Sequence, residues 1–181
     1  MEQYNLLVTY HGGLEGLGET EVRARLQEAG GILEELKRSE IDGVFVCRVS
    51  GDAKKVVADV RTICIGAPDL FQETHHWTPV ERWVKAEPGE MAAAAGELGM
   101  GIGQNDRWML VLRKRRTQLH TMDLIKLLTD PVDRGKVDLK HPDKMLVVEI
   151  MGDVAGMSLV TKEQMLDVNK VREEVELGRI G

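Results

Sequence analysis

Four consecutive cationic residues follow an apolar run near the middle of this chain. The run is Trp-Met-Leu-Val-Leu at residues 108–112, and Arg113, Lys114, Arg115 and Arg116 come directly after it. Four adjacent like charges repel one another, so a folded domain holds them most easily where a polyanion such as RNA neutralises them. The alternative is that they end an edge strand and point into water, where charge deters pairing with another chain.

Further groups suited to phosphate follow these cations. Thr121 is expected to cap a helix over residues 122–128, whose N-terminal N–H groups and dipole favour an anion. His141 is interpreted either as a ring that stacks on a terminal base or as a solvated loop histidine. We expect the whole set to gather on one side of the C-terminal unit. The predicted RNA-binding residues are Arg113, Lys114, Arg115, Arg116, His120, Thr121, Lys126, Lys136, Lys140, His141 and Lys144.

The basic character is local. The 181-residue chain holds 24 Lys and Arg against 30 Asp and Glu, a net charge of −6, which by itself argues against a nucleic-acid partner. Residues 101–150, however, hold 10 basic and 7 acidic side chains. Because salt screens charge over about 8 Å in the cell, the potential at a surface decides phosphate contact, and the net charge does not.

Other patterns that resemble reactive sites have ordinary structural explanations. The glycine run at residues 99–103 follows an alanine-rich helix and precedes a strand, the reverse of the order in a cofactor-binding loop. His75 and His76 are adjacent on a predicted strand and therefore point to opposite faces, which does not suit a shared metal ion. Cys47 and Cys64 lie in apolar segments and are interpreted as buried, reduced thiols. We predict no catalytic residues, no cofactor and no metal.

The composition is that of a globular protein, with 43% hydrophobic and 30% charged residues. The longest apolar runs fall well short of the roughly 20 residues that a membrane span requires, and the N-terminus lacks a secretory signal pattern. The sequence therefore predicts a cytoplasmic protein with no membrane partner.

The first 85 residues alternate in a regular order of strands and helices. Apolar spacing, the glycine pair 30–31 and the Asp42-Gly43 turn set the boundaries. The expected order is strand 5–10, helix 19–29, strands 32–38 and 44–49, helix 52–65 and strand 74–85. This β-α-β-β-α-β order predicts a ferredoxin-like domain over residues 1–85.

A second α/β unit is expected over residues 86–181, which makes the chain an α+β protein of two packed units. Pro88 opens a helix that continues to residue 98. The remaining expected elements are strand 108–112, helix 122–128, extended segments 136–139, 145–151 and 154–160, and a closing helix from residue 161 to 175.

This second unit resembles the THUMP domain, an RNA-binding module shared by several tRNA-modifying systems. The resemblance is carried by the strand and cations at 108–116, the Leu-His-Thr-Met-Asp-Leu helix opening at 119–124, and the run Lys-Val-Asp-Leu-Lys-His-Pro-Asp at 136–143 with its following strand. A ferredoxin-like unit before a THUMP unit is also the family's usual arrangement. The resemblance implies recognition of the acceptor end of tRNA, largely through backbone and shape, with no DNA partner.

Most members of the family carry a catalytic domain after the THUMP unit, and this sequence ends at Gly181. It is therefore similar to the stand-alone branch, whose members present tRNA to an RNA cytidine acetyltransferase that makes N4-acetylcytidine. The expectation is a non-catalytic tRNA-binding adaptor that takes part in tRNA modification and processing.

Two other classes of function remain open from the sequence. One is a small-molecule enzyme, either acylphosphatase-like or S-adenosylmethionine-binding, on the ferredoxin-like scaffold. The loop after the first strand, however, has no Arg to hold a phosphate, and fold alone does not imply function. The other is a protein-interaction scaffold with no RNA partner, which the acidic first half would suit.

Overall fold

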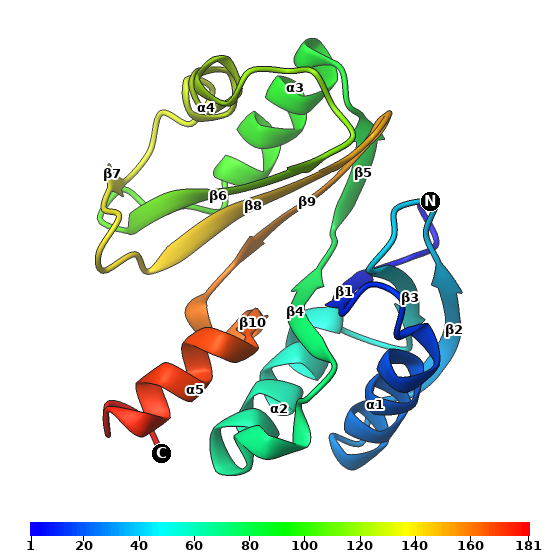
Figure 1. The fold of residues 1–181 in the computed structure, drawn as a ribbon. Helices are drawn as coiled ribbons and strands as arrows, with labels where there is room; N and C mark the ends of the chain where they lie inside the picture. The colour runs from blue at the N-terminus through cyan, green and yellow to red at the C-terminus, as the bar shows by residue number, and fades with distance from the viewer. The chain divides into compact units, whose positions relative to one another are not determined.

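The computed structural model describes all 181 residues and separates into two compact units (Figure 1). The first unit comprises residues 3–79 and 163–181 together with Met1. The second comprises residues 80–162 together with Glu2. The protein is a mixed α+β chain, a ferredoxin-like unit followed by a THUMP-like α/β unit, as the sequence predicts. None of its helices combines the length and the apolar character needed to cross a membrane.

The first unit is built on an antiparallel sheet in the order β10-β4-β1-β3-β2. The order β4-β1-β3-β2 is that of the ferredoxin-like arrangement, and β10 adds a fifth strand at the edge beside β4 (Figure 1). The strands are β1 (Leu6–Tyr10), β2 (Leu33–Arg38), β3 (Val44–Val49), β4 (Thr74–Pro79) and β10 (Leu166–Asp167).

Apolar side chains of this sheet pack with its helices into one core. Leu6 and Val8 on β1, Phe45 on β3 and Trp77 on β4 are all fully buried there. Their alternation with residues of the other face follows the two-residue period of a strand. The helices of the unit are α1 (Glu15–Glu28), α2 (Ala53–Gly66), the short 3-10 turn η1 (Pro68–Leu70) and α5 (Val168–Glu176).

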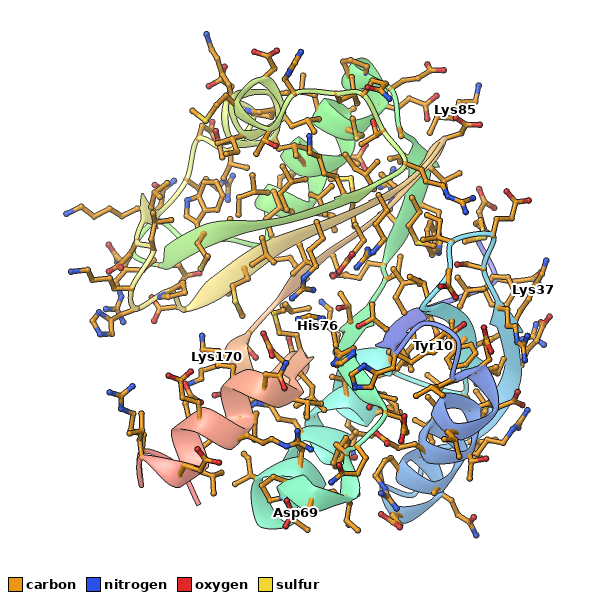
Figure 2. The ribbon with its side chains drawn as sticks, viewed as in Figure 1. Tyr10, Lys37, Asp69, His76, Lys85 and Lys170 are labelled. Carbon is orange, nitrogen blue, oxygen red and sulfur yellow. The ribbon has the colours of Figure 1, made fainter.

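The last 19 residues belong to the first unit, which differs from the expected division at residue 85. Leu166 pairs with Trp77 on β4, and Leu166, Val168 and Val171 are buried in the core of the first unit. His76 lies on β4 (Figure 2). Its Nε2 atom is 3.3 Å from the Asp167 Oδ2 atom across this pair of strands. The sequence had assigned residues 161–175 to a closing helix of the second unit, but their apolar side chains complete the first.

The expected strand at 74–85 is also two strands in different sheets. Pro79 ends β4, and the chain then enters the second unit, where β5 (Arg82–Lys85) pairs with β9. Proline cannot donate a hydrogen bond to a sheet ladder, which explains why pairing stops there. The second unit therefore begins at about residue 80, six residues earlier than expected.

The second unit is a mixed sheet in the order β5-β9-β8-β6-β7. Strand β6 runs parallel to both β7 and β8, whereas β9 is antiparallel to β8 and to β5. The strands that follow β5 are β6 (Arg107–Arg115), β7 (Lys136–Val137), β8 (Lys144–Met151) and β9 (Val154–Val160), and the short 3-10 turn η2 (Lys162–Gln164) leads out of the unit.

Two helices cover one face of this sheet (Figure 1). They are α3 (Pro88–Gly99) and α4 (Thr121–Thr129). Met91 from α3 and Leu124 from α4 are buried against Trp108 on β6 and Val148 on β8. Because side chains alternate along a strand, the odd-numbered positions 109–115 of β6 point to the face without helices. Arg113 and Arg115 therefore share one face, and Lys114 lies on the other.

Candidate nucleic-acid interface

The chain turns sharply where the four cations occur. Arg115 is the last residue of β6, and Arg116 follows with φ of 52°, a left-handed conformation that residues other than glycine rarely adopt. The turn ends the strand and leaves the Arg116 side chain exposed to solvent. Of the four predicted cations, Arg116 is the one best placed to meet a phosphate.

Arg113 and Arg115 are engaged with a buried carboxylate. Arg113 Nη1 donates to Glu149 Oε1 at 2.8 Å, and Arg115 Nη1 donates to Glu149 Oε2 at 2.7 Å. Glu149 is on β8 directly beside Arg113, and its side chain is only 2% exposed. A carboxylate removed from water needs such partners, because an unpaired buried charge is strongly destabilising. These two guanidinium groups therefore neutralise Glu149 and do not stand free for RNA.

Lys114 points to the helical face and anchors the loop that leads to α4. Its Nζ atom donates to the Leu119 carbonyl oxygen at 2.7 Å, while its side chain remains exposed. Helix α4 begins two residues later, at Thr121. His120 is the N-cap residue, and its side chain makes no capping hydrogen bond. This corrects the prediction that Thr121 caps the helix: Thr121 is the first helical residue.

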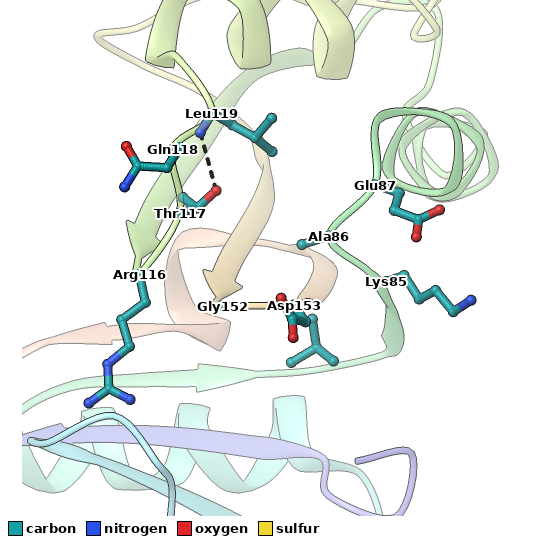
Figure 3. Close-up of a pocket in the computed structure, with 10 residues that line it drawn as sticks. Lys85, Ala86, Glu87, Arg116, Thr117, Gln118, Leu119, Gly152 and Asp153 are labelled. Atoms are coloured by element: carbon teal, nitrogen blue, oxygen red, sulfur yellow. Dashed lines mark hydrogen bonds between the residues drawn. The ribbon is translucent and has the colours of Figure 1, made fainter.

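A pocket of about 650 Å³ opens at this end of the second unit (Figure 3). The end of β5, the loop from Arg116 to Leu119 and the turn between β8 and β9 form its wall. Two cations, Lys85 and Arg116, and two carboxylates, Glu87 and Asp153, are among its lining residues. In Figure 3 the Arg116 and Lys85 side chains extend away from each other, so the two cations do not converge on a single anion.

Three of the other predicted residues lie at the opposite end of the same sheet. Lys136 pairs with Arg107 and Lys144 with Trp108, at the start of β6, and the exposed Lys140 lies in the loop between β7 and β8. Arg115 lies seven positions after Trp108, which is about 23 Å along a strand. His141 is exposed in the same loop.

The Lys144 side chain is held by two neighbouring groups near the start of β6. Its Nζ atom lies 2.8 Å from Asp106 Oδ2 and donates to the Gly101 carbonyl oxygen at 2.7 Å. The hydrogen bond from Lys144, together with that from the Gly103 N–H, lowers the pKa of Asp106. Lys144 therefore holds the loop after α3 in place, which is a structural role.

The predicted residues therefore do not form one continuous basic surface. Lys114, Arg116, His120 and Thr121, hereafter the β6–α4 surface, lie at one end of β6. The group around the loop after β7 lies at the other end. Lys126 is exposed in the last turn of α4 and so belongs to neither group. This corrects the expectation of a single positive side.

Glu149 is the important residue that the sequence reasoning did not single out. It is the one charge inside the otherwise apolar stretch Met145–Met151 of β8. A lone carboxylate in a buried strand requires cationic partners, and the neighbouring cationic run was the available source. That signal was present in the sequence, but the register of two strands 36 residues apart was not.

The glycine run, the two cysteines and the adjacent histidines each occupy a structural position. Gly99 ends α3, and the glycine run leads into β6 without following a strand. Both cysteines are free and buried, and burial raises the pKa of Cys47 to about 12 and that of Cys64 to about 11. His76 faces Thr9 and Asp167, whereas the His75 ring meets His11 edge-on at 4.2 Å.

The segment that carries these cations is similar to a known domain family. Residues 110–160 match the family model of the THUMP domain. The chain contains a THUMP domain. The matched segment extends from within β6 to the end of β9, and so includes Arg113–116, helix α4 and the loop after β7. No curated protein matches the chain.

Solved structures share the fold around this THUMP domain at low sequence identity. The structure of PH1313 from Pyrococcus horikoshii OT3 aligns with a TM-score of 0.59 at 14% identity, over 87% of this chain and 55% of that one. TrmN from Thermus thermophilus aligns with a TM-score of 0.51 at 16% identity, over 85% of this chain and 44% of that one. The chain thus spans about half the length of these proteins, and the similarity concerns the fold alone.

Proposed function

We propose that this protein binds tRNA through its THUMP domain. The observation that carries the proposal is the match of residues 110–160 to the THUMP family model, because that segment contains all of the predicted RNA-binding residues. The chain as a whole is acidic, so binding depends on a local surface and not on a general attraction to polyanions.

The β6–α4 surface is the part of the domain that we propose contacts the tRNA backbone. A-form RNA is recognised mainly through phosphates, 2′-hydroxyls and unpaired ends, because its major groove is too deep and narrow for side chains. Arg116 offers an exposed guanidinium group suited to bidentate phosphate contact, with Lys114 two residues away. The first N–H groups of α4 add a favourable dipole beside them.

We further propose a non-catalytic role in the cytoplasm, in which the protein holds the acceptor end of tRNA for a modifying enzyme. The proposed enzyme is an RNA cytidine acetyltransferase that makes N4-acetylcytidine. The sequence resemblance to stand-alone THUMP proteins supports this step, and the binding surface is compatible with it. Arg113 and Arg115 contribute by bracing the end of β6 against Glu149, which fixes the direction in which Arg116 leaves the strand.

A charge-reversal experiment tests tRNA binding. The Lys114→Glu/Arg116→Glu variant is expected to bind tRNA about 10-fold more weakly at 100 mM salt. It should also reduce the slope of log K against log salt by roughly 1.5, from the loss of two phosphate contacts. The matched control is Lys37→Glu/Arg38→Glu, which makes the same charge change on exposed residues of β2 in the other unit. Equal weakening by both variants, or by neither, contradicts the proposed surface.

The adaptor role has a separate test in cells. Deleting the gene should remove N4-acetylcytidine from tRNA, and the wild-type protein should restore it while Lys114→Glu/Arg116→Glu should not. Unchanged N4-acetylcytidine in the deletion strain would contradict the proposed enzyme partner. Whether the purified protein binds tRNA is decided separately, by the charge-reversal experiment.

A further inference from the structure

Two aliphatic side chains stand exposed beside the edge strand of the second unit. Val137 on β7 is 58% exposed, and Leu139 in the following loop is 71% exposed. Exposed single aliphatic residues are common on protein surfaces. A single residue separates these two, however, and three exposed basic or histidine residues flank them in the sequence: Lys136, Lys140 and His141.

The loop that carries them, residues 136–141, has a fixed conformation. The Lys136 N–H donates to the Asp106 carbonyl oxygen and the Asp138 N–H to the Trp108 carbonyl oxygen, both at 2.9 Å. Asp138 Oδ1 then accepts from the N–H groups of Lys140 and His141, also at 2.9 Å. These two hydrogen bonds lower the pKa of Asp138, so the carboxylate that holds the turn is ionised at neutral pH. A partner would therefore meet a pre-ordered loop, which reduces the entropy cost of binding.

The carboxylates of this corner are already committed to other groups. Asp143 accepts from Arg107 Nη2 at 3.1 Å, and Asp106 lies 2.8 Å from Lys144 Nζ. Asp138 is occupied by backbone N–H groups. Lys136 and Lys140 form no ion pair with any of these carboxylates, so both ammonium groups remain available to a partner.

The simplest explanation of such lysines is protection of a sheet edge, since lysine and short length both deter strand pairing. That explanation fits the two-residue length of β7 and argues against addition of a partner strand. It does not explain why Val137 and Leu139 are apolar. RNA phosphates do not explain them either, because aliphatic groups gain most by leaving water in an apolar environment.

We propose that the 136–141 loop is a docking surface for a partner protein, which receives Val137 and Leu139 in an apolar hollow rimmed by carboxylates. The lysines and the aliphatic pair then each meet a complementary group. An apolar centre with a charged rim is the usual anatomy of a protein interface. The loop pairs with the start of β6, about 23 Å along that strand from Arg115, so it can hold a partner while the β6–α4 surface holds tRNA.

The occupant can be identified by photocrosslinking in cells. A benzophenone amino acid at position 139 is compared with one at position 177, where Leu177 is similarly exposed in the other unit. The proposal expects a nuclease-resistant crosslink to a specific protein at position 139 that is absent at position 177. A crosslink to RNA at position 139, or no crosslink beyond that of the control, overturns the proposal.

The crosslinked protein, identified and purified, is then titrated against the full-length chain. Val137→Ser/Leu139→Ser should weaken its binding by at least about 10-fold, and Lys136→Glu/Lys140→Glu should weaken it in a salt-dependent manner. All four residues are exposed, so both variants should keep the wild-type melting temperature, and tRNA binding by Val137→Ser/Leu139→Ser should remain within about 2-fold of wild type. Unchanged affinity of the partner for the aliphatic variant overturns the inference, whereas failure of the wild type to bind tRNA would contradict only the proposed function.

Discussion

Glu149 holds an unusual position among the charged residues of this protein. Each of its carboxylate oxygens accepts from a different arginine, and its side chain is 2% exposed. Arg113 and Arg115 retain 20% and 25% exposure, so the buried charge lies at the carboxylate. Breaking a buried pair by removing one partner costs far more than breaking an exposed pair, because an uncompensated charge remains.

The Glu149→Gln variant is expected to lower the free energy of unfolding by about 2 kcal/mol, because two partly exposed guanidinium groups lose the charged partner that they share. The amide cannot neutralise two guanidinium groups, which would then repel each other on one strand. Urea unfolding followed by circular dichroism measures the loss. The matched control is Glu97→Gln, which removes a carboxylate that pairs with Arg82 while 56% exposed, and should cost less than about 1 kcal/mol. Equal losses in the two variants would show that burial of Glu149 has no special energetic role.

For single residues, the sequence predicts burial better than it predicts contact partners. It correctly assigned Cys47 and Cys64 to buried, reduced positions, because both lie in largely apolar segments, which indicates burial. It could not show that Arg113 and Arg115 meet Glu149, because that contact depends on the register of β6 against β8. A cationic run therefore predicts an ionic role, and only the fold decides between a carboxylate and a phosphate as its partner.

The short strand β10 and helix α5 are the elements that the sequence placed in the wrong unit. Leu166 on β10 is fully buried in the core of the first unit, beside Trp77 on β4. Asp167 caps α5 by accepting from the Lys170 N–H at 3.1 Å, so strand and helix are directly joined. The apolar pattern shows that this segment buries one face, but it does not show against which core.

Leu166→Ala should destabilise the first unit by about 2–4 kcal/mol, because it leaves a cavity among buried neighbours. Leu177→Ala, close behind in the chain but 56% exposed, should change stability by less than about 0.5 kcal/mol. Hydrogen exchange can locate the effect: faster exchange is expected in β4 and α2, with β6 and β8 unchanged. Faster exchange in β6 instead would contradict the assignment of β10 to the first sheet.

Helices and turns with strong local signals were predicted well. Asp52 caps α2 by accepting from the Lys54 N–H at 2.9 Å, and Gly43 adopts φ of 78° in the turn between β2 and β3. Pro79 ends β4, but local sequence does not reveal that β5 joins another sheet. Cap and turn chemistry acts over a few residues, whereas sheet membership is decided by contacts distant in sequence.

The whole molecule consists of a unit assembled from two separated segments and a unit assembled almost entirely from one. The first unit carries 17 acidic and 11 basic residues, and the second carries 13 of each. Even the THUMP-containing unit therefore has no net positive charge. Its proposed affinity for tRNA depends on where the exposed cations lie, because other cations, such as Arg113 and Arg115, already pair with Glu149.

Residues 3–79 expressed alone should fail to fold cooperatively, because they lack β10 and α5. Joining residues 163–181 to Pro79 through a flexible Gly-Ser linker should restore a cooperative thermal transition, since it returns Leu166, Val168 and Val171 to their core. The control is the same linked protein with Leu166, Val168 and Val171 all changed to Ser. Cooperative melting of residues 3–79 by themselves would contradict the role assigned to the C-terminal segment.

The split of the first unit also has a consequence for synthesis on the ribosome. The strand that completes its sheet, β10, is translated after every residue of the second unit. Because the chain emerges N-terminus first, the edge of β4 that pairs with β10 stays unpaired while more than 80 residues are added. During that interval we expect the nascent chain to expose part of this core, including Trp77, and therefore to bind a chaperone until α5 leaves the exit tunnel.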